Sequence, residues 1–360
     1  MAHRVFNFNP GPSTLPLSVL EKIQGELLDY RGTGMSIMES SHRSPEYDEV
    51  NESAIALTRE LFGLSDDYHV LFLTGGASNQ FAMIPMNFLK KGRTASYVDT
   101  GSWSAKAIKE SQNIGETHVA FSGKAGEYKH IPSDAELDVP DDAAYVHITT
   151  NNTIKGTQFH HTPKVQAPLI ADMSSDIGSM RRDHASYAMI YAGAQKNLGP
   201  AGVTLVAMRD ELLQQSNDAL PTVLNYKTQA GKKSLYNTPP SFPIYVMNLV
   251  LQWVKDQGGL ETVQKVNAQK KDLVYGMIDA HPEFFRGTVE KDSRSWMNIT
   301  LRLPDEELEK KFITEAKAAG LVGLKGHRSV GGIRVSLYNA MPLAGAEAVR
   351  DFMQEFMSKA

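Results

Sequence analysis

Short apolar runs alternate with segments of helical periodicity through the first two thirds of the chain. Helix-like stretches cover residues 17–30, 45–62, 79–90 and 103–112. Strand-like runs occur at residues 69–73, 95–98, 117–121, 144–149, 169–171, 189–192 and 203–208. Seven apolar runs separated by helices predict an α/β fold built on a mostly parallel, seven-stranded sheet.

The pattern changes near residue 259. A long helix at residues 259–280 leads to strands near 285–289 and 296–303. A helix at 305–319, a strand at 333–337 and a last helix at 343–358 complete the chain. We therefore expect two domains, as is usual for 360 residues. The large domain is expected to cover residues 16–258, and a smaller α+β domain to combine residues 1–15 with 259–360.

Composition narrows the possible functions. The net charge of −4 argues against nucleic acid or an anionic membrane as the main partner. The chain has no cysteine, which excludes disulfides and thiol chemistry, and we expect no metal site. No apolar run approaches the roughly 20 residues of a membrane span. The first residues lack the apolar core of a signal peptide, so we expect a cytoplasmic protein.

The strongest chemical signal is a lysine and an aspartate at the ends of two strand-like runs. Lys196 follows the run at 189–192 and is surrounded by small residues, and Asp172 ends the run 168–172 (PLIAD). Pyridoxal 5'-phosphate needs this pair of groups. A lysine forms the Schiff base, and a carboxylate pairs with the protonated ring nitrogen so that the ring accepts electrons.

Three further features follow other strand-like runs. Residues 74–80 (TGGASNQ) form a glycine turn that lets backbone N–H groups approach a phosphate at a helix start. Trp103 comes just after a strand, where an indole can stack on a pyridine ring, and Thr153 places a hydroxyl after the strand at 144–149. Ligands bind at the carboxyl ends of such strands, so these features are expected to form one cofactor site.

Two His-Arg pairs indicate the substrate. His42–Arg43 precedes the second helix, and His327–Arg328 lies six residues before Arg334. Arginine forks suit carboxylate and phosphate oxygens, and histidine adds a further donor. These residues predict a substrate that carries both a carboxylate and a phosphate.

The chain resembles the phosphoserine aminotransferase family, class V members of the fold type I pyridoxal-phosphate enzymes. The resemblance covers nearly the whole sequence. Its motifs are residues 6–12 (FNFNPGP), 41–43 (SHR), 192–202 (AGAQKNLGPAG), 237–240 (NTPP), 325–328 (KGHR) and 336–340 (SLYNA).

The resemblance implies roles for individual residues. Lys196 is then the Schiff-base lysine and Asp172 the partner of the pyridinium nitrogen. The implied remaining cofactor contacts within one chain are Ala77, Ser78, Trp103, Thr153 and Gln195. Asn237 and Thr238 would reach the cofactor phosphate from the other subunit of a homodimer with shared active sites.

The substrate contacts are implied in the same way. Arg334 would take the α-carboxylate, while His42, Arg43, His327 and Arg328 would surround the substrate phosphate. One departure concerns Ser78, because many members carry arginine in that loop. The chain therefore has one positive charge fewer there.

The implied reaction is a reversible transamination in serine biosynthesis. L-glutamate and 3-phosphohydroxypyruvate give 2-oxoglutarate and O-phospho-L-serine. The family also acts on 3-hydroxy-2-oxo-4-phosphooxybutanoate, which gives 4-phosphohydroxy-L-threonine, a step toward pyridoxal phosphate. The alternatives are an aminotransferase for an unphosphorylated keto acid, such as glyoxylate or pyruvate, and a non-catalytic pyridoxal-phosphate-binding protein. A cysteine desulfurase is excluded because the chain has no cysteine.

Overall fold

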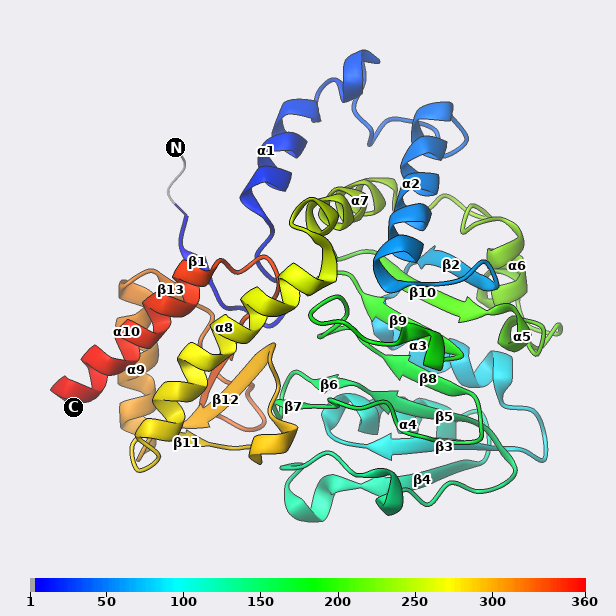
Figure 1. The fold of residues 1–360 in the computed structure, drawn as a ribbon. Helices are drawn as coiled ribbons and strands as arrows, with labels where there is room; N and C mark the ends of the chain where they lie inside the picture. Colours follow the sequence, from blue (N-terminus) through cyan, green and yellow to red (C-terminus); the bar gives the residue numbers. More distant parts are fainter. Residues whose placement is uncertain (1–3) are drawn as a thin grey trace.

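The computed structural model describes residues 4–360, and a seven-stranded sheet is its largest element (Figure 1). In spatial order its strands are β2 (Tyr68–Leu73), β10 (Thr204–Arg209), β9 (Met189–Gly193), β8 (Leu169–Asp172), β5 (Ala143–Thr149), β3 (Thr94–Asp99) and β4 (Thr117–Ser122). Strand β10 is antiparallel to both neighbours, and the other neighbouring pairs are parallel. The expected α/β class with a mostly parallel sheet is confirmed.

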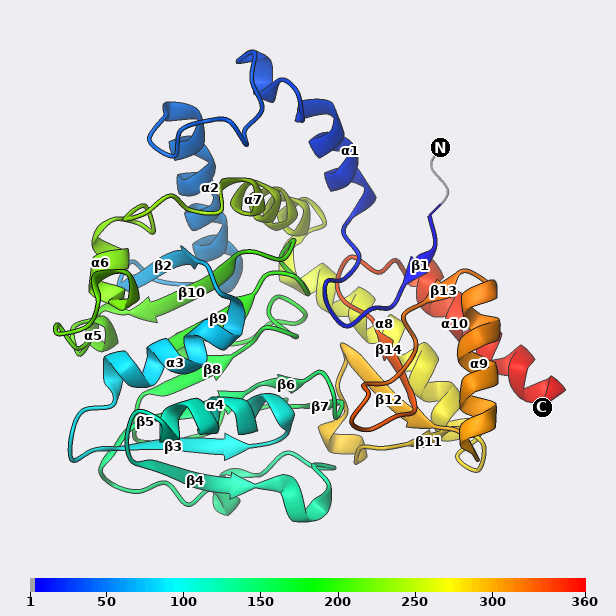
Figure 2. The same ribbon diagram turned by 180° about the vertical axis from the view of Figure 1, so that it is seen from behind.

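Helices cover both faces of this sheet. Along β9, Ile190 and Ala192 pack in one cluster of buried side chains, while Met189 and Tyr191 pack in another. The first cluster includes α2 (Pro45–Phe62) and α7 (Ser241–Asp256). Helices α3 (Gly76–Phe88) and α4 (Ser102–Gln112) cover the opposite face, in front of the sheet in Figure 2. Burial on both faces explains why the strands read as continuous apolar runs.

The C-terminal part forms its own cluster of buried side chains, which Phe8 joins from the N-terminal segment. Its elements are α8 (Gly259–Ala280), β11 (Arg286–Gly287), β12 (Asn298–Arg302), α9 (Glu306–Ala318), β13 (Leu321–Val322), β14 (Ile333–Ser336) and α10 (Leu343–Lys359). Strands β11, β12 and β14 form an antiparallel sheet, and β1 (Phe6–Asn7) pairs in parallel with β13. The expected domain boundaries stay a prediction.

The remaining elements are short. They are α1 (Leu17–Glu26), α5 (Asp210–Leu213), α6 (Tyr226–Gly231), the hairpin β6 (Asn151–Asn152) and β7 (Thr157–Gln158), and the 3-10 helices η1 (Tyr30–Gly32), η2 (Gly123–Gly126), η3 (Asp134–Glu136), η4 (His184–Ser186), η5 (Thr222–Leu224) and η6 (Lys291–Ser293). Across residues 4–360, no helix is both long and apolar enough to cross a membrane.

One expected boundary was wrong in a way that matters for the site. The helix expected at residue 79 begins at Gly76. Gly75 precedes it with φ +91°, and a Cβ at that position would lie 2.5 Å from Cβ of Asn79. The turn therefore needs glycine, and it places the glycine sequence directly at the N-terminus of α3.

Candidate active site

The carboxyl ends of the parallel strands open into a cavity of about 300 Å³. Asp172 is the last residue of β8, and Lys196 comes three residues after β9. The first turns of α3 and α4, which follow β2 and β3, also line the cavity. Nine of the expected site residues line it, namely Ala77, Ser78, Trp103, Thr153, Asp172, Gln195, Lys196, His327 and Arg334.

Lys196 extends into this cavity. Its Nζ donates a hydrogen bond of 2.7 Å to Thr153 Oγ1 and lies 5.6 Å from the centre of the Trp103 ring. Burial lowers the pKa of Lys196 to about 8, Asp172 opposes this shift, and Arg334 adds to it. The neutral amine is therefore far more abundant near pH 7 than it is for an exposed lysine.

Asp172 is buried at the same edge of the sheet, with 5% of its surface exposed. Burial raises the pKa of Asp172, whereas hydrogen bonding by Ser174 and the charge of Lys196 lower it. The Ser174 N–H donates to Asp172 Oδ1 at 2.9 Å, and Ser174 Oγ accepts from the Gly193 N–H at 3.0 Å. Ser174 thus ties the carboxylate to the end of β9.

The start of α3 has the features of an anion-binding site. This helix has no side chain that caps its N-terminus, so the N–H groups of its first turn are left for another acceptor. Ala77 and Ser78 belong to that turn and line the cavity. The Trp103 Nε1 group is also buried without a partner in the described chain. A phosphate on a flat heterocycle fits these donors and the indole.

Arg334 brings a positive charge to the cavity from β14. It is buried, with 5% exposed, and its Nη1 donates to the Thr153 carbonyl at 3.2 Å. Its Nε has no partner within residues 4–360, so the guanidinium retains donors for an incoming anion. His327 lies beside it, and burial together with Arg334 and Arg328 lowers the pKa of His327. This histidine is therefore mostly neutral near pH 7.

Five expected site residues do not line this cavity in the single chain. Arg328 is exposed next to His327. His42 and Arg43 lie just before α2, which begins at Pro45. Asn237 and Thr238 lie exposed between α6 and α7, and the Asn237 side chain donates to the Thr238 carbonyl at 3.2 Å.

The motif at residues 6–12 was noted in the sequence, but the packing of this N-terminal loop on Lys196 was not predicted. The Ser13 N–H donates to the Gln195 carbonyl at 2.9 Å, and Ser13 Oγ donates to the Lys196 carbonyl. Gly11 has φ +138°, and a Cβ there would lie 3.2 Å from Cγ of Lys196. Its place between two prolines was the only available signal of a fixed, close approach. Ser174 was missed as well, and its position two residues after Asp172 was its only signal.

The sequence matches the family model described as Aminotransferase class-V over residues 5–349. It is 54% identical to the phosphoserine aminotransferase of Halalkalibacterium halodurans, over 98% of each chain. The solved phosphoserine aminotransferase from Bacillus circulans subsp. alkalophilus is 53% identical and superposes with a TM-score of 0.98 over 100% of both chains. The pyridoxal-phosphate-bound enzyme from Trichomonas vaginalis is 35% identical, with a TM-score of 0.92 over 98% of this chain and 100% of its own.

Proposed function

The chain belongs to the class V aminotransferase family, and we propose that the Lys196 cavity is its catalytic site. The fold is that of a fold type I pyridoxal-phosphate transferase, and the cofactor is pyridoxal 5'-phosphate. The reaction is the reversible transamination of 3-phosphohydroxypyruvate with L-glutamate, which belongs to serine biosynthesis. The observation that carries the assignment is the placement of Lys196, Asp172 and Trp103 around one cavity.

The residues of the cavity fit the cofactor. When bound, pyridoxal phosphate supplies a ring that accepts the electron pair of a broken Cα–H bond. Asp172, buried at the end of β8, would hold the proton of the ring nitrogen. Trp103 would cover the ring, and the uncapped first turn of α3 would take the phosphate.

Proton transfer falls to Lys196. Its pKa of about 8 leaves an amine that can both accept and return a proton near neutral pH. Thr153, within 2.7 Å of the amine, restrains its position. Arg334 lies on the same cavity and would pair with the substrate α-carboxylate, which fixes the Cα–H bond relative to Lys196.

We infer that a second copy of the chain completes the site for the substrate phosphate. Of the four residues expected around that phosphate, only His327 lines the cavity of the single chain. The segment between α1 and α2, which contains His42, carries exposed apolar side chains, with 86% of Leu28 and 51% of Met38 exposed. Tyr236, next to Asn237, is 43% exposed. We propose that a homodimer covers these side chains and brings His42, Arg43, Asn237 and Thr238 to the partner's cavity.

Substrate choice tests the phosphate site. The enzyme is expected to prefer 3-phosphohydroxypyruvate to hydroxypyruvate, and we propose that 3-hydroxy-2-oxo-4-phosphooxybutanoate is also accepted because it presents the same phosphate. A charged hydrogen bond contributes about 1.5–3 kcal/mol, so Arg328→Gln should reduce this preference ten- to hundred-fold. Arg350→Gln, an arginine change on distant α10, is the control. An unchanged preference in Arg328→Gln would remove Arg328 from the phosphate site.

Subunit mixing tests the shared site. Lys196→Ala and Asn237→Ala/Thr238→Ala homodimers are each expected to be nearly inactive. In a mixed dimer one site would carry both lesions and the other neither, so mixing should restore up to half of the wild-type activity per dimer. If subunit exchange is verified and no activity returns, Asn237 and Thr238 do not serve the partner's cofactor.

A further inference from the structure

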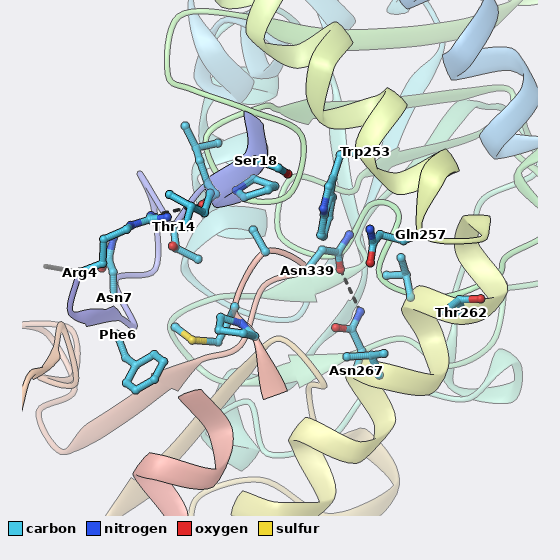
Figure 3. A pocket seen from close by; sticks show the side chains of 18 of the residues that line it. Arg4, Phe6, Asn7, Thr14, Ser18, Trp253, Gln257, Thr262, Asn267 and Asn339 are labelled. Carbon is cyan, nitrogen blue, oxygen red and sulfur yellow. Dashed lines mark hydrogen bonds between the residues drawn. The ribbon is translucent and has the colours of Figure 1, made fainter. Parts of the chain in front are cut away.

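A second cavity of about 540 Å³ lies between the N-terminal segment, α8 and the loop after β14 (Figure 3). It shares no lining residue with the Lys196 cavity among the residues that the structure describes. Its volume falls in the range of sites that hold small organic molecules. The transamination assigned above makes no use of it.

The walls of this cavity are largely apolar. Trp253 at the end of α7 and Val263 and Val266 on α8 form one side. Leu15 in the N-terminal segment and Met341 in the loop after β14 also line the cavity. An indole beside aliphatic side chains suits the flat face of an aromatic ring.

One end of the cavity favours an anion. Arg4 lies there, and its Nη2 donates to the Leu15 carbonyl at 3.3 Å, which leaves further N–H groups of the fork for a ligand. Helix α1, ten residues long, also begins at this cavity after Pro16 and has no side-chain cap. The N–H groups of its first turn therefore add to the positive potential.

A hydrogen-bond acceptor without a partner lies on the opposite side. Asn267 is 1% exposed, and its Nδ2 donates to the Ser179 carbonyl at 2.8 Å and to Asn339 Oδ1 at 2.9 Å. These two acceptors fix the orientation of the amide, and Oδ1 then has no partner within residues 4–360. In Figure 3 this oxygen is turned away from Asn339 toward the cavity. A buried acceptor of this kind favours a ligand that carries a donor.

We propose that this cavity binds an aromatic carboxylic acid whose ring carries an O–H or N–H donor remote from the carboxylate. The carboxylate pairs with Arg4 and the first turn of α1, the ring lies against Trp253, and the ring donor reaches Asn267 Oδ1. The carboxylate, the aromatic ring and the ring donor of the ligand thus each contact a different part of the cavity.

Residues on both walls of the cavity are connected to the segment that carries Lys196. The Asn339 N–H donates to Asn197 Oδ1 at 2.9 Å, and Asn197 directly follows Lys196. On the other wall, Thr14 follows Ser13, whose hydroxyl donates to the Lys196 carbonyl.

The test is calorimetric titration of the holoenzyme with 4-hydroxyphenylacetate, which has neither an amino nor a keto group and so cannot be transaminated. Binding is expected to persist with the catalytic site saturated by O-phospho-L-serine. Phenylacetate and 4-methoxyphenylacetate, which lack the donor, should bind about five-fold more weakly, the effect of one hydrogen bond. Absence of binding, or displacement by O-phospho-L-serine, would overturn the proposal.

Variants separate this site from the rest of the surface. Arg4→Gln should weaken binding of 4-hydroxyphenylacetate at least ten-fold, whereas Lys22→Gln, the same loss of charge on exposed α1, should not. Val266→Phe should fill the cavity and abolish binding while the holoenzyme keeps its transamination rate. Equal effects of Arg4→Gln and Lys22→Gln, or full binding by Val266→Phe, would place the ligand elsewhere.

Discussion

Lys196 should make the stability of the cofactor-free protein depend on pH. Burial lowers the pKa of its amine from 10.5 to about 8 in the folded chain, and unfolding returns it to 10.5. Between these values the unfolded chain binds more protons than the folded chain, so the free energy of unfolding rises with pH across this window. Well below pH 8 the Lys196 amine is protonated in both the folded and the unfolded chain, so its contribution to the pH dependence ends.

The size of the effect follows from the same two values. Their difference is 10.5 − 8, and each pKa unit corresponds to about 1.4 kcal/mol, which gives at most about 3 kcal/mol. Lys196 lines an open cavity and keeps some contact with water, so the measured rise should fall below this limit. A rise of about 1–2 kcal/mol between pH 8 and 10 is expected.

The assay is urea unfolding of the cofactor-free protein from pH 7 to pH 10, with Lys196→Met as the reference. Methionine keeps an apolar stem of similar length but cannot titrate. The buried Lys270, whose pKa burial lowers to about 7, titrates in a neighbouring range in both proteins, so the difference between them reports Lys196 alone. Lys109→Met, on the exposed side of α4, controls for the loss of one lysine.

The reasoning is refuted if the wild-type and Lys196→Met curves run parallel over the whole range. A second variant tests the named cause. Asp172 opposes the lowering of the Lys196 pKa, so Asp172→Asn should move the midpoint of the rise to lower pH. A midpoint that stays in place would show that the carboxylate does not act on the amine.

Three further predictions follow from single contacts. Lys196→Ala should abolish the visible cofactor band and steady-state turnover, whereas Asp172→Ala should bind cofactor and lose most of its rate. Absorbance spectra measure cofactor binding, and steady-state kinetics measure the rate. Lys270→Met should lower the free energy of unfolding by about 3 kcal/mol in urea titrations, because Nζ donates to the carbonyls of Leu337, Tyr338 and Met341 at 3.2, 2.9 and 3.0 Å. Gly11→Ala should lower turnover at least ten-fold in steady-state assays, because its Cβ would meet Lys196.

The elements that the sequence predicted well have clear ends or long patterns. Helix α2 begins and ends as expected, since Ser44 Oγ accepts the Tyr47 N–H at its start and Gly63 adopts φ +61° at its end. The strands of the large sheet were within a few residues because both of their faces are buried. The pairing of β1 with β13 had no such signal, because two-residue strands carry no periodicity and their partners are more than 300 residues apart.

The residues of the candidate site can also be divided into those that the sequence predicts and those that it does not. Residues such as Asp172 and Trp103 were predictable because the carboxyl ends of parallel strands meet at one edge. Ser174 and Ser13 could not be predicted in this way. They act through hydroxyl and backbone hydrogen bonds, and serine is common in ordinary turns. The contact of Arg334 Nη1 with the Thr153 carbonyl joins residues 181 positions apart, and only the packing of the C-terminal part on the sheet creates it.

The charges in the cavity support the proposal that a second chain completes the site for the substrate. The keto acid has a carboxylate and a phosphate, and the first turn of α3 is needed for the phosphate of the cofactor. Arg334 can neutralise the carboxylate, but the lowered pKa of His327 leaves this residue mostly uncharged near pH 7. Ser78, in the first turn of α3, carries no charge. The dianionic phosphate therefore needs cations from outside this cavity, which Arg328 at the rim and Arg43 of a second copy would supply.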